Sequence, residues 1–319
     1  MVVKLDGWDR KVLYELEKDA SISLSKMSKA VGRSKEFISY RIKRLEGEGV
    51  IKGYTAIVDM SKLGYFTFRV YLKFQNTDDL KVMEMVELLK KEEKVWTIAK
   101  LHGKWDYAFF IGVKNLMEFH DVWDAFLSTF KENIKENRIA IYSPIYNFNK
   151  RFFMPEGKGI VERAIGVGPE QKVERLDMNI IKTWGSDVRQ SSPEVARKLN
   201  TTPKTVTRRI KVMRMKKIIT GCKIDLDQGT LGYQGYRVDL SLNSVMRKRE
   251  LFSYCKNHPN IYQINDSIGG ADFEFEIIVQ GLEELLRIMN DMMVTFRGVI
   301  RDYEYFSFLV FPKLTIVPD

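Results

Sequence analysis

Hydrophobic and polar positions follow two different periods along this chain. Between residues 6 and 18, apolar side chains recur every three or four positions, which predicts an amphipathic helix. Between Phe66 and Phe74 they occupy every second position, which predicts a strand with one apolar face. Helical periods fill the chain up to residue 53 and mixed periods follow, so we predict a small helical domain followed by an α+β domain.

Residues 1–53 carry the signals of three short helices. Asp6 is placed to cap the first helix, and Ser23 and Ser34 are placed to cap the second and third. Gly32 lies between the last two helices, where a tight turn favours a residue that tolerates positive φ. The third helix turns three apolar residues inward: Ile38, Ile42 and Leu45. This pattern predicts a helix-turn-helix domain.

After residue 53 the order of periods is βαββαβ, which predicts a ferredoxin-like domain. The strand near 107–113 is apolar on both faces, so we expect helices on one face and another sheet on the other. In the corresponding strand of the second half, Glu274 and Glu276 lie on that second face. These two carboxylates predict that this face of the second sheet is more hydrated than the same face of the first.

The second half of the chain repeats the first in the same order. Leu5-Asp6 recurs at Leu176-Asp177, the run Arg-Ile-Lys at 41–43 recurs at 209–211, and Leu-Gly-Tyr at 63–65 recurs at 231–233. In the second copy we expect Ser192-Pro193 and Thr202-Pro203 to start helices, with Asn200 in the turn where the first copy has Gly32. The fold class predicted is therefore α+β, with two helix-turn-helix domains alternating with two βαββαβ ferredoxin-like domains.

This repeat sets the expected domain boundaries. Residues 154–172 are rich in glycine and charge without an apolar period, which is typical of a linker. The expected order is helix-turn-helix (1–53), ferredoxin-like (54–153), linker (154–172), helix-turn-helix (173–221) and ferredoxin-like (222–319).

Composition favours a folded protein and gives no sign of a cofactor or metal site. Of 319 residues, 45% are hydrophobic and 29% are charged. No apolar run approaches the roughly 18 to 20 residues of a membrane span, and the N-terminal sequence lacks a leader pattern, so we expect a cytoplasmic protein. Cys222 and Cys255 lie far apart without metal-ligand spacing and are expected to be buried thiols.

The location of positive charge points to a polyanionic partner. The net charge is +10, and residues 197–217 contain nine lysines and arginines and no acid. A surface of one sign on the helix placed to enter a groove is expected of a protein that neutralises DNA phosphates; the alternative is a purely structural three-helix core. The candidate DNA-contacting residues are Ser34, Lys35, Ser39, Tyr40, Arg41, Lys43, Arg44, Thr202, Lys204, Thr207, Arg208, Arg209 and Lys211.

The run RIKRLEGEGVIKGYTAIVD at residues 41–59 resembles the end of the helix-turn-helix in the Lrp/AsnC (feast/famine) regulators. RIKVMRMKKIITGCKIDLD at 209–227 is similar but replaces the leucine with Met213. The resemblance implies DNA binding by dimers that assemble further through their βαββαβ (RAM-type) domains, and amino-acid sensing near a loop with a Gly-x-x-Asp pattern. By resemblance, that loop holds Gly103, Asp106, Gly269 and Asp272; the alternative is that these are ordinary hairpin residues.

These observations predict a transcription regulator that binds double-stranded DNA and is not an enzyme. One chain would form an internal pseudo-dimer with recognition helices about 34 Å apart, and chains would associate into homo-oligomers. Two alternatives remain open. The first is an enzyme, since subunits of siroheme decarboxylases resemble this fold, although His102, His120 and His258 do not align between the halves. The second is a sequence-tolerant DNA-coating protein.

Overall fold

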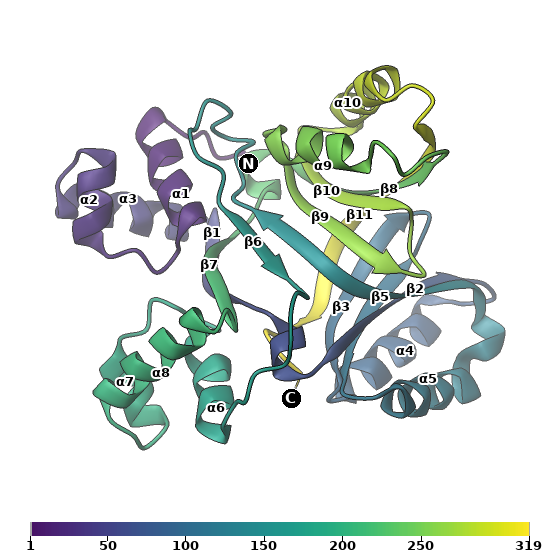
Figure 1. Cartoon of the computed structure of the whole chain (residues 1–319), viewed down its shortest axis with the longest axis horizontal. Helices are drawn as coiled ribbons and strands as arrows, with labels where there is room; N and C mark the ends of the chain where they lie inside the picture. The colour runs from purple at the N-terminus through teal and green to yellow at the C-terminus, as the bar shows by residue number, and fades with distance from the viewer. Residues whose placement is uncertain (1, 319) are drawn as a thin grey trace.

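The computed structural model describes residues 2–318, and its first three helices form a compact domain (Figure 1). They are α1 (Gly7–Lys18), α2 (Leu24–Val31) and α3 (Lys35–Gly47). Asp6 and Asp9 form a reciprocal capping box at α1, and Ser23 and Ser34 cap α2 and α3. Gly32 has φ of 75°, so the caps and the turn predicted from the sequence are confirmed.

The second helical domain contains α6 (Arg175–Trp184), α7 (Ser192–Lys198) and α8 (Pro203–Met215). Asn200 has φ of 49° and Thr202 caps α8, as predicted. The start of α7 was predicted one residue too late. Ser191 is its N-cap, because the Ser191 hydroxyl and the Glu194 carboxylate form a capping box, and Ser192 and Pro193 are already helical.

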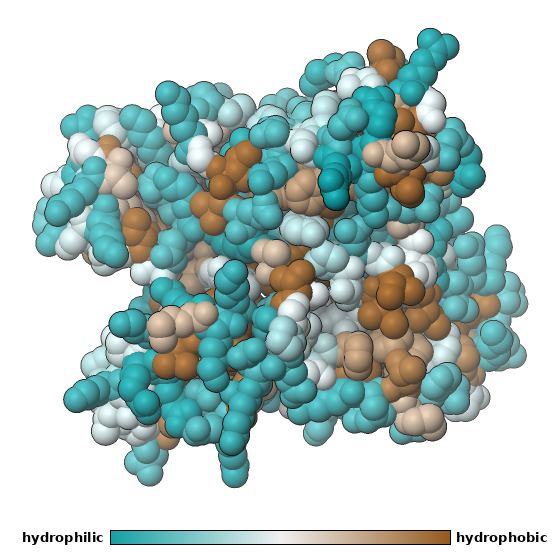
Figure 2. Space-filling model, in the orientation of Figure 1, coloured by the Kyte–Doolittle hydropathy of each residue, from teal (hydrophilic) through white to brown (hydrophobic). Residues whose placement is uncertain are grey.

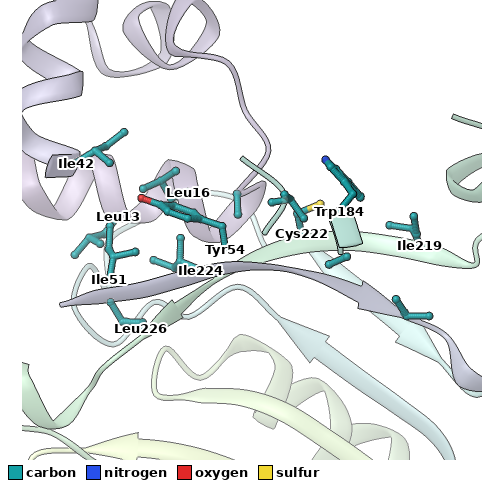
Figure 3. Close-up of a cluster of buried hydrophobic side chains, with 14 of the residues drawn as sticks. Leu13, Leu16, Ile42, Ile51, Tyr54, Trp184, Ile219, Cys222, Ile224 and Leu226 are labelled. Carbon is teal, nitrogen blue, oxygen red and sulfur yellow. The ribbon is translucent and has the colours of Figure 1, made fainter. Parts of the chain in front are cut away.

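A two-stranded antiparallel ribbon joins the two helical domains. It pairs β1 (Ile51–Val58) with β7 (Ile219–Leu226), placing Thr55 opposite Lys223. Figure 3 shows apolar side chains of the first helical domain, of both strands and of Trp184 in α6 gathered along this ribbon. The two domains therefore share one hydrophobic core, and the boundaries predicted at 53 and 221 fall inside the paired strands.

Each half then continues as βαββαβ, which confirms the fold class. The first half has β2 (Phe66–Phe74), α4 (Asp79–Lys91), β3 (Val95–Gly103), β4 (Tyr107–Val113), α5 (Leu116–Phe130) and β5 (Ile134–Phe148). The second has β8 (Gln234–Leu242), α9 (Lys248–Asn257), β9 (Ile261–Ile268), β10 (Phe273–Val279), α10 (Leu282–Thr295) and β11 (Ile300–Leu314). Short 3-10 helices lie at Met60–Leu63, Lys131–Asn133 and Gly229–Leu231.

The long last strand of each half pairs with a strand of the other half. Strand β5 pairs with β9, and β11 pairs with β3. Because β5 also pairs with β2, hydrogen bonding runs through β5-β2-β4-β3-β11-β8-β10-β9 and returns to β5. The two sheets therefore close into a barrel, with helices covering its outside (Figure 1). The expected pairing of sheet against sheet is confirmed.

The inner surface of this barrel holds a buried ionic cluster that corrects one prediction. Glu274 and Glu276 do not make a wetter surface, since Glu274 is 0% exposed and Glu276 8% exposed. The Glu274 carboxylate accepts hydrogen bonds from Arg69 Nη2 at 2.8 Å and from Arg237, one arginine from each half. Burial acts to raise the pKa of Glu274, but the charges of Arg237 and Arg69 outweigh it and lower the pKa to about 2.

The segment 154–172, predicted as a linker, is packed against both the barrel and α1. It contains β6 (Glu162–Ile165), which extends the sheet next to β5. Arg163 is buried and donates to the carbonyl oxygens of Glu17 and Lys18 at the end of α1, at 2.8 and 2.6 Å. Both cysteines are buried thiols, as expected. Within residues 2–318, no helix is long and apolar enough to cross a membrane.

Candidate nucleic-acid interface

The outer face of α8 carries cationic side chains without acidic neighbours. Lys204, Arg208 and Lys211 are exposed, and each lies about one helical turn from the next. Thr207 lies between them, and its hydroxyl is 3.0 Å from both the Ser192 hydroxyl and the Pro203 carbonyl oxygen. Figure 2 shows mainly hydrophilic side chains over this helical domain on the face in view, with a few apolar ones between them. We call Lys204, Arg208 and Lys211 the α8 cationic face.

The outer face of α3 is more mixed in charge. Lys35 and Lys43 are exposed beside Glu36, Ser39 is half-buried, and Tyr40 is 64% exposed. Ser34 and Thr202 sit at the N-termini of the two third helices, where their hydroxyls accept from Phe37 N and Thr205 N at 3.2 Å each. The third helix of each helical domain, α3 and α8, therefore presents a different set of side chains to DNA.

Three of the candidate DNA-contacting arginines are engaged within their own domains. Arg41 and Arg44 both pair with Asp9, whose side chain is fully buried, and Arg44 Nη2 lies 2.6 Å from the carboxylate. Arg209 pairs with Glu174 and Asp177 at 2.6 and 3.1 Å. Their guanidinium groups tie the third helix of each domain to the start of the first, so we propose no DNA contact for them. The sequence could not reveal this, since the partners lie 32 or more residues away.

Replacing Arg209 with alanine is therefore expected to change stability and not DNA affinity. Loss of its two partly exposed ion pairs should lower the free energy of unfolding by about 1 kcal/mol, with less than about a twofold change in DNA affinity. Arg208→Ala on the α8 cationic face is the matched control and should show the opposite pattern. Thermal unfolding and DNA titration of both variants measure this; a larger loss of DNA affinity in Arg209→Ala than in Arg208→Ala would contradict it.

Contacts across the β1–β7 ribbon fix the spacing of the two helical domains. Ala56 N donates to the carbonyl oxygen of Gly185 at 2.8 Å, and Val188 N donates to that of Tyr54 at 2.9 Å. Arg189 also donates to Ile22 O in the first helical domain at 2.9 Å. Backbone hydrogen bonds and a shared core thus hold α3 and α8 in one rigid arrangement.

The four loop residues predicted to contact an effector have structural roles at the boundary between the halves. Asp106 accepts from Phe74 N and Asp272 from Leu242 N, both at 2.7 Å, which ties each hairpin to the end of the first barrel strand of its own half. Gly103 and Gly269 have φ of 123° and 82°. A Cβ on Gly269 would come within 2.6 Å of a backbone oxygen of β5 in the other half. Effector binding at these loops stays a prediction.

The sequence did not point to a cavity of about 640 Å³ between the helical domains and the barrel. Its walls come from β1, β7, one end of the barrel, β6 and the last residues of the chain. Lys223 and Asp225 of β7, two residues apart on one face, are the charged side chains of the ribbon that line it. The only signal in the sequence is this alternation, which any exposed strand would show.

The histidines and acidic residues form no site of their own among the described residues. His102 and His120 are exposed, and His258 is half-buried with a pKa lowered by burial and by the nearby charge of Arg151. None of the three lines the cavity. Across residues 2–318, no group of three or more histidine, cysteine or acidic side chains is arranged to hold a metal ion.

One solved structure matches this chain over almost its full length. The structure superposes on a siroheme decarboxylase, NirDL, with a TM-score of 0.65, covering 98% of this chain and 94% of that one at 12% sequence identity. At this identity the likeness shows a common fold.

Sequence relatives identify the family. The family model of the AsnC-type helix-turn-helix domain matches residues 5–46. The HTH-type transcriptional regulator FL11 of Pyrococcus abyssi is 33% identical over 124 residues, which is 39% of this chain and 81% of that protein. The transcriptional regulator AzlB of Bacillus subtilis is 31% identical over 122 residues, 38% of this chain and 78% of that protein. Each of these relatives aligns with a stretch about as long as one of the two repeated units of this chain. The chain belongs to the Lrp/AsnC family of transcription regulators.

Proposed function

We propose that this chain regulates transcription by binding double-stranded DNA with α3 and α8 in neighbouring major grooves. The α8 cationic face carries the proposal, because it is exposed, of one sign, and placed on the third helix of a helix-turn-helix domain. The β1–β7 ribbon supports it, because the ribbon holds the two third helices in one arrangement, as a dimer of single units would.

The two half-sites in the DNA are expected to differ. Lys204, Arg208 and Lys211 are suited to phosphates and guanine edges. Ser39, Tyr40 and Lys43 offer hydroxyl groups, a ring and one cation. Because α3 and α8 present different side chains, we expect the chain to prefer a DNA site whose two halves differ in sequence.

Selection from random duplex DNA tests the proposal. Bound fragments should share two unlike motifs whose centres lie about one turn of DNA apart, roughly 10 to 10.5 base pairs. Repeating the selection with amino acids present tests the predicted effector. A palindromic motif protected by a single chain would contradict the unlike half-sites, and equal affinity for selected and random DNA would favour a DNA-coating protein.

A catalytic role is the second candidate, and the full-length fold match to a siroheme decarboxylase is the observation that favours it. We propose regulation instead, because the sequence relatives FL11 and AzlB are named as transcriptional regulators and α8 keeps an exposed cationic face. Haem-like absorbance in the purified protein would favour the enzyme.

A further inference from the structure

The cavity between the helical domains and the barrel contains an unpaired cation. Lys223 lines it from the centre of β7, and more than a third of the residue is accessible. The Lys223 backbone is paired opposite Thr55 in the ribbon, but its ammonium group forms no hydrogen bond or ion pair within residues 2–318. An ammonium group that lines a cavity without a counter-ion would be stabilised by an anionic ligand.

The lining also holds a second lysine, Lys182, and three carboxylates, and the carboxylates limit how much negative charge a ligand can carry. Glu276 accepts from the Tyr262 hydroxyl at 2.6 Å and from Gln263 at 3.1 Å, and Asp59 accepts from Gly166 N at 2.9 Å. Asp225 is exposed two residues from Lys223. These three carboxylates would repel a second negative charge on the ligand. The cavity therefore suits a monoanion.

The rest of the lining is largely apolar and aromatic. Phe110 and Tyr142 stack with ring centroids 5.9 Å apart at the barrel end. Phe308 and Phe311 of β11 stack at 5.7 Å, and Ile145 of β5 also lines the space. A volume of about 640 Å³ lies within the range of small-molecule sites, which are typically apolar with a few placed polar groups.

We propose that this cavity binds a small aromatic or branched monocarboxylate, with its carboxylate on Lys223 and its apolar body among Phe110, Tyr142 and Phe308. The site is separate from the Gly-x-x-Asp loops and requires no DNA. It is also asymmetric, because the residue opposite Lys223 in the ribbon, Thr55, carries no charge.

Calorimetric titration of the DNA-free full chain tests this site. The probes are 3-phenylpropanoate and its neutral partner 3-phenylpropan-1-ol. The acid should bind at least about tenfold more tightly than the alcohol, because only the acid can form a charge-assisted hydrogen bond with Lys223. Lys223→Met should weaken acid binding by about tenfold or more, whereas Lys223→Arg should stay within about threefold of the wild type.

Lys91→Met, at an exposed lysine on α4, is the matched surface control and should bind like the wild type. Circular dichroism of each variant verifies folding. If Lys223→Met does not fold, the acid and alcohol titrations of the wild type still decide the matter. Equal affinity for acid and alcohol, or unchanged acid binding in a folded Lys223→Met, would overturn the proposal. Because no DNA is present, neither result depends on the proposed regulatory function.

Discussion

Replacing Glu274 with alanine is expected to lower the free energy of unfolding by about 3 to 5 kcal/mol. Glu274 lies between Arg69 and Arg237, both 0% exposed, and its removal leaves two buried guanidinium groups without their shared carboxylate. Alanine is the natural residue at the corresponding position of the first half, Ala108, so a strand of this fold accommodates alanine there. The expected loss of stability therefore comes from the two uncompensated guanidinium groups. Urea unfolding followed by circular dichroism measures the loss.

The pH dependence of unfolding provides a second readout for this variant. Since the pKa of Glu274 in the folded protein is lowered to about 2, its carboxylate contributes stability that is complete above the pKa of an unfolded glutamate. That contribution should disappear as the pH falls from about 5 towards 2, and Glu274→Ala should lack this part of the acid sensitivity. Glu93→Ala, at an exposed residue, is the control. Equal stability of both variants would refute the role assigned to the cluster.

Replacing Arg208 and Lys211 together with alanine is expected to flatten the salt dependence of DNA binding. Each phosphate contact contributes about 0.9 to the slope of log K against log salt, so the slope should fall by up to about 2. Affinity should fall by one to two orders of magnitude at low salt, at roughly 1 kcal/mol or more for each cation removed. Fluorescence anisotropy with a selected duplex between about 50 and 200 mM salt gives both quantities.

A double variant on α4, Lys90→Ala with Lys91→Ala, removes the same charge far from α8 along the chain. It should keep the wild-type slope, since a general loss of positive charge acts only through long-range attraction that salt screens. If the α8 variant also keeps the wild-type slope, α8 does not contact DNA phosphates.

Local patterns predicted the helical domains well because their determinants are close in sequence. The turn at Gly32 and its counterpart at Asn200 both adopt positive φ, and the caps at Ser34 and Thr202 each bond a backbone N–H three residues ahead. The alternation from Phe66 to Phe74 gives the bounds of β2 without error. Hydrogen-bonding rules over a few residues decide all of these features.

The rest of the site depends on contacts between distant residues, which no local period reports. Arg209 looks like a DNA-contacting residue on its helix, and only the packing of α8 against the start of α6 places Glu174 beside it. Glu274 alternates like a solvent-facing strand residue, but closure of the barrel brings Arg69 from 205 residues away. The cavity is a space left between elements of both halves, so no single segment encodes it.

The ionic cluster also bears on why the two halves occur in one polypeptide. Two copies of the first half would bring Arg69 against its own twin with alanine at position 108, and two copies of the second half would set two Arg237 side chains against two each of Glu274, Glu276 and Asp239. In the mixed pairing, three arginines (Arg69, Arg138 and Arg237) face these three acids. Only the mixed pairing balances these charges. If the halves were separate polypeptides, pairing of a first half with a second half would compete with dimers of two identical halves. A covalent connection raises the local concentration of the correct partner and allows each copy to diverge without losing the other.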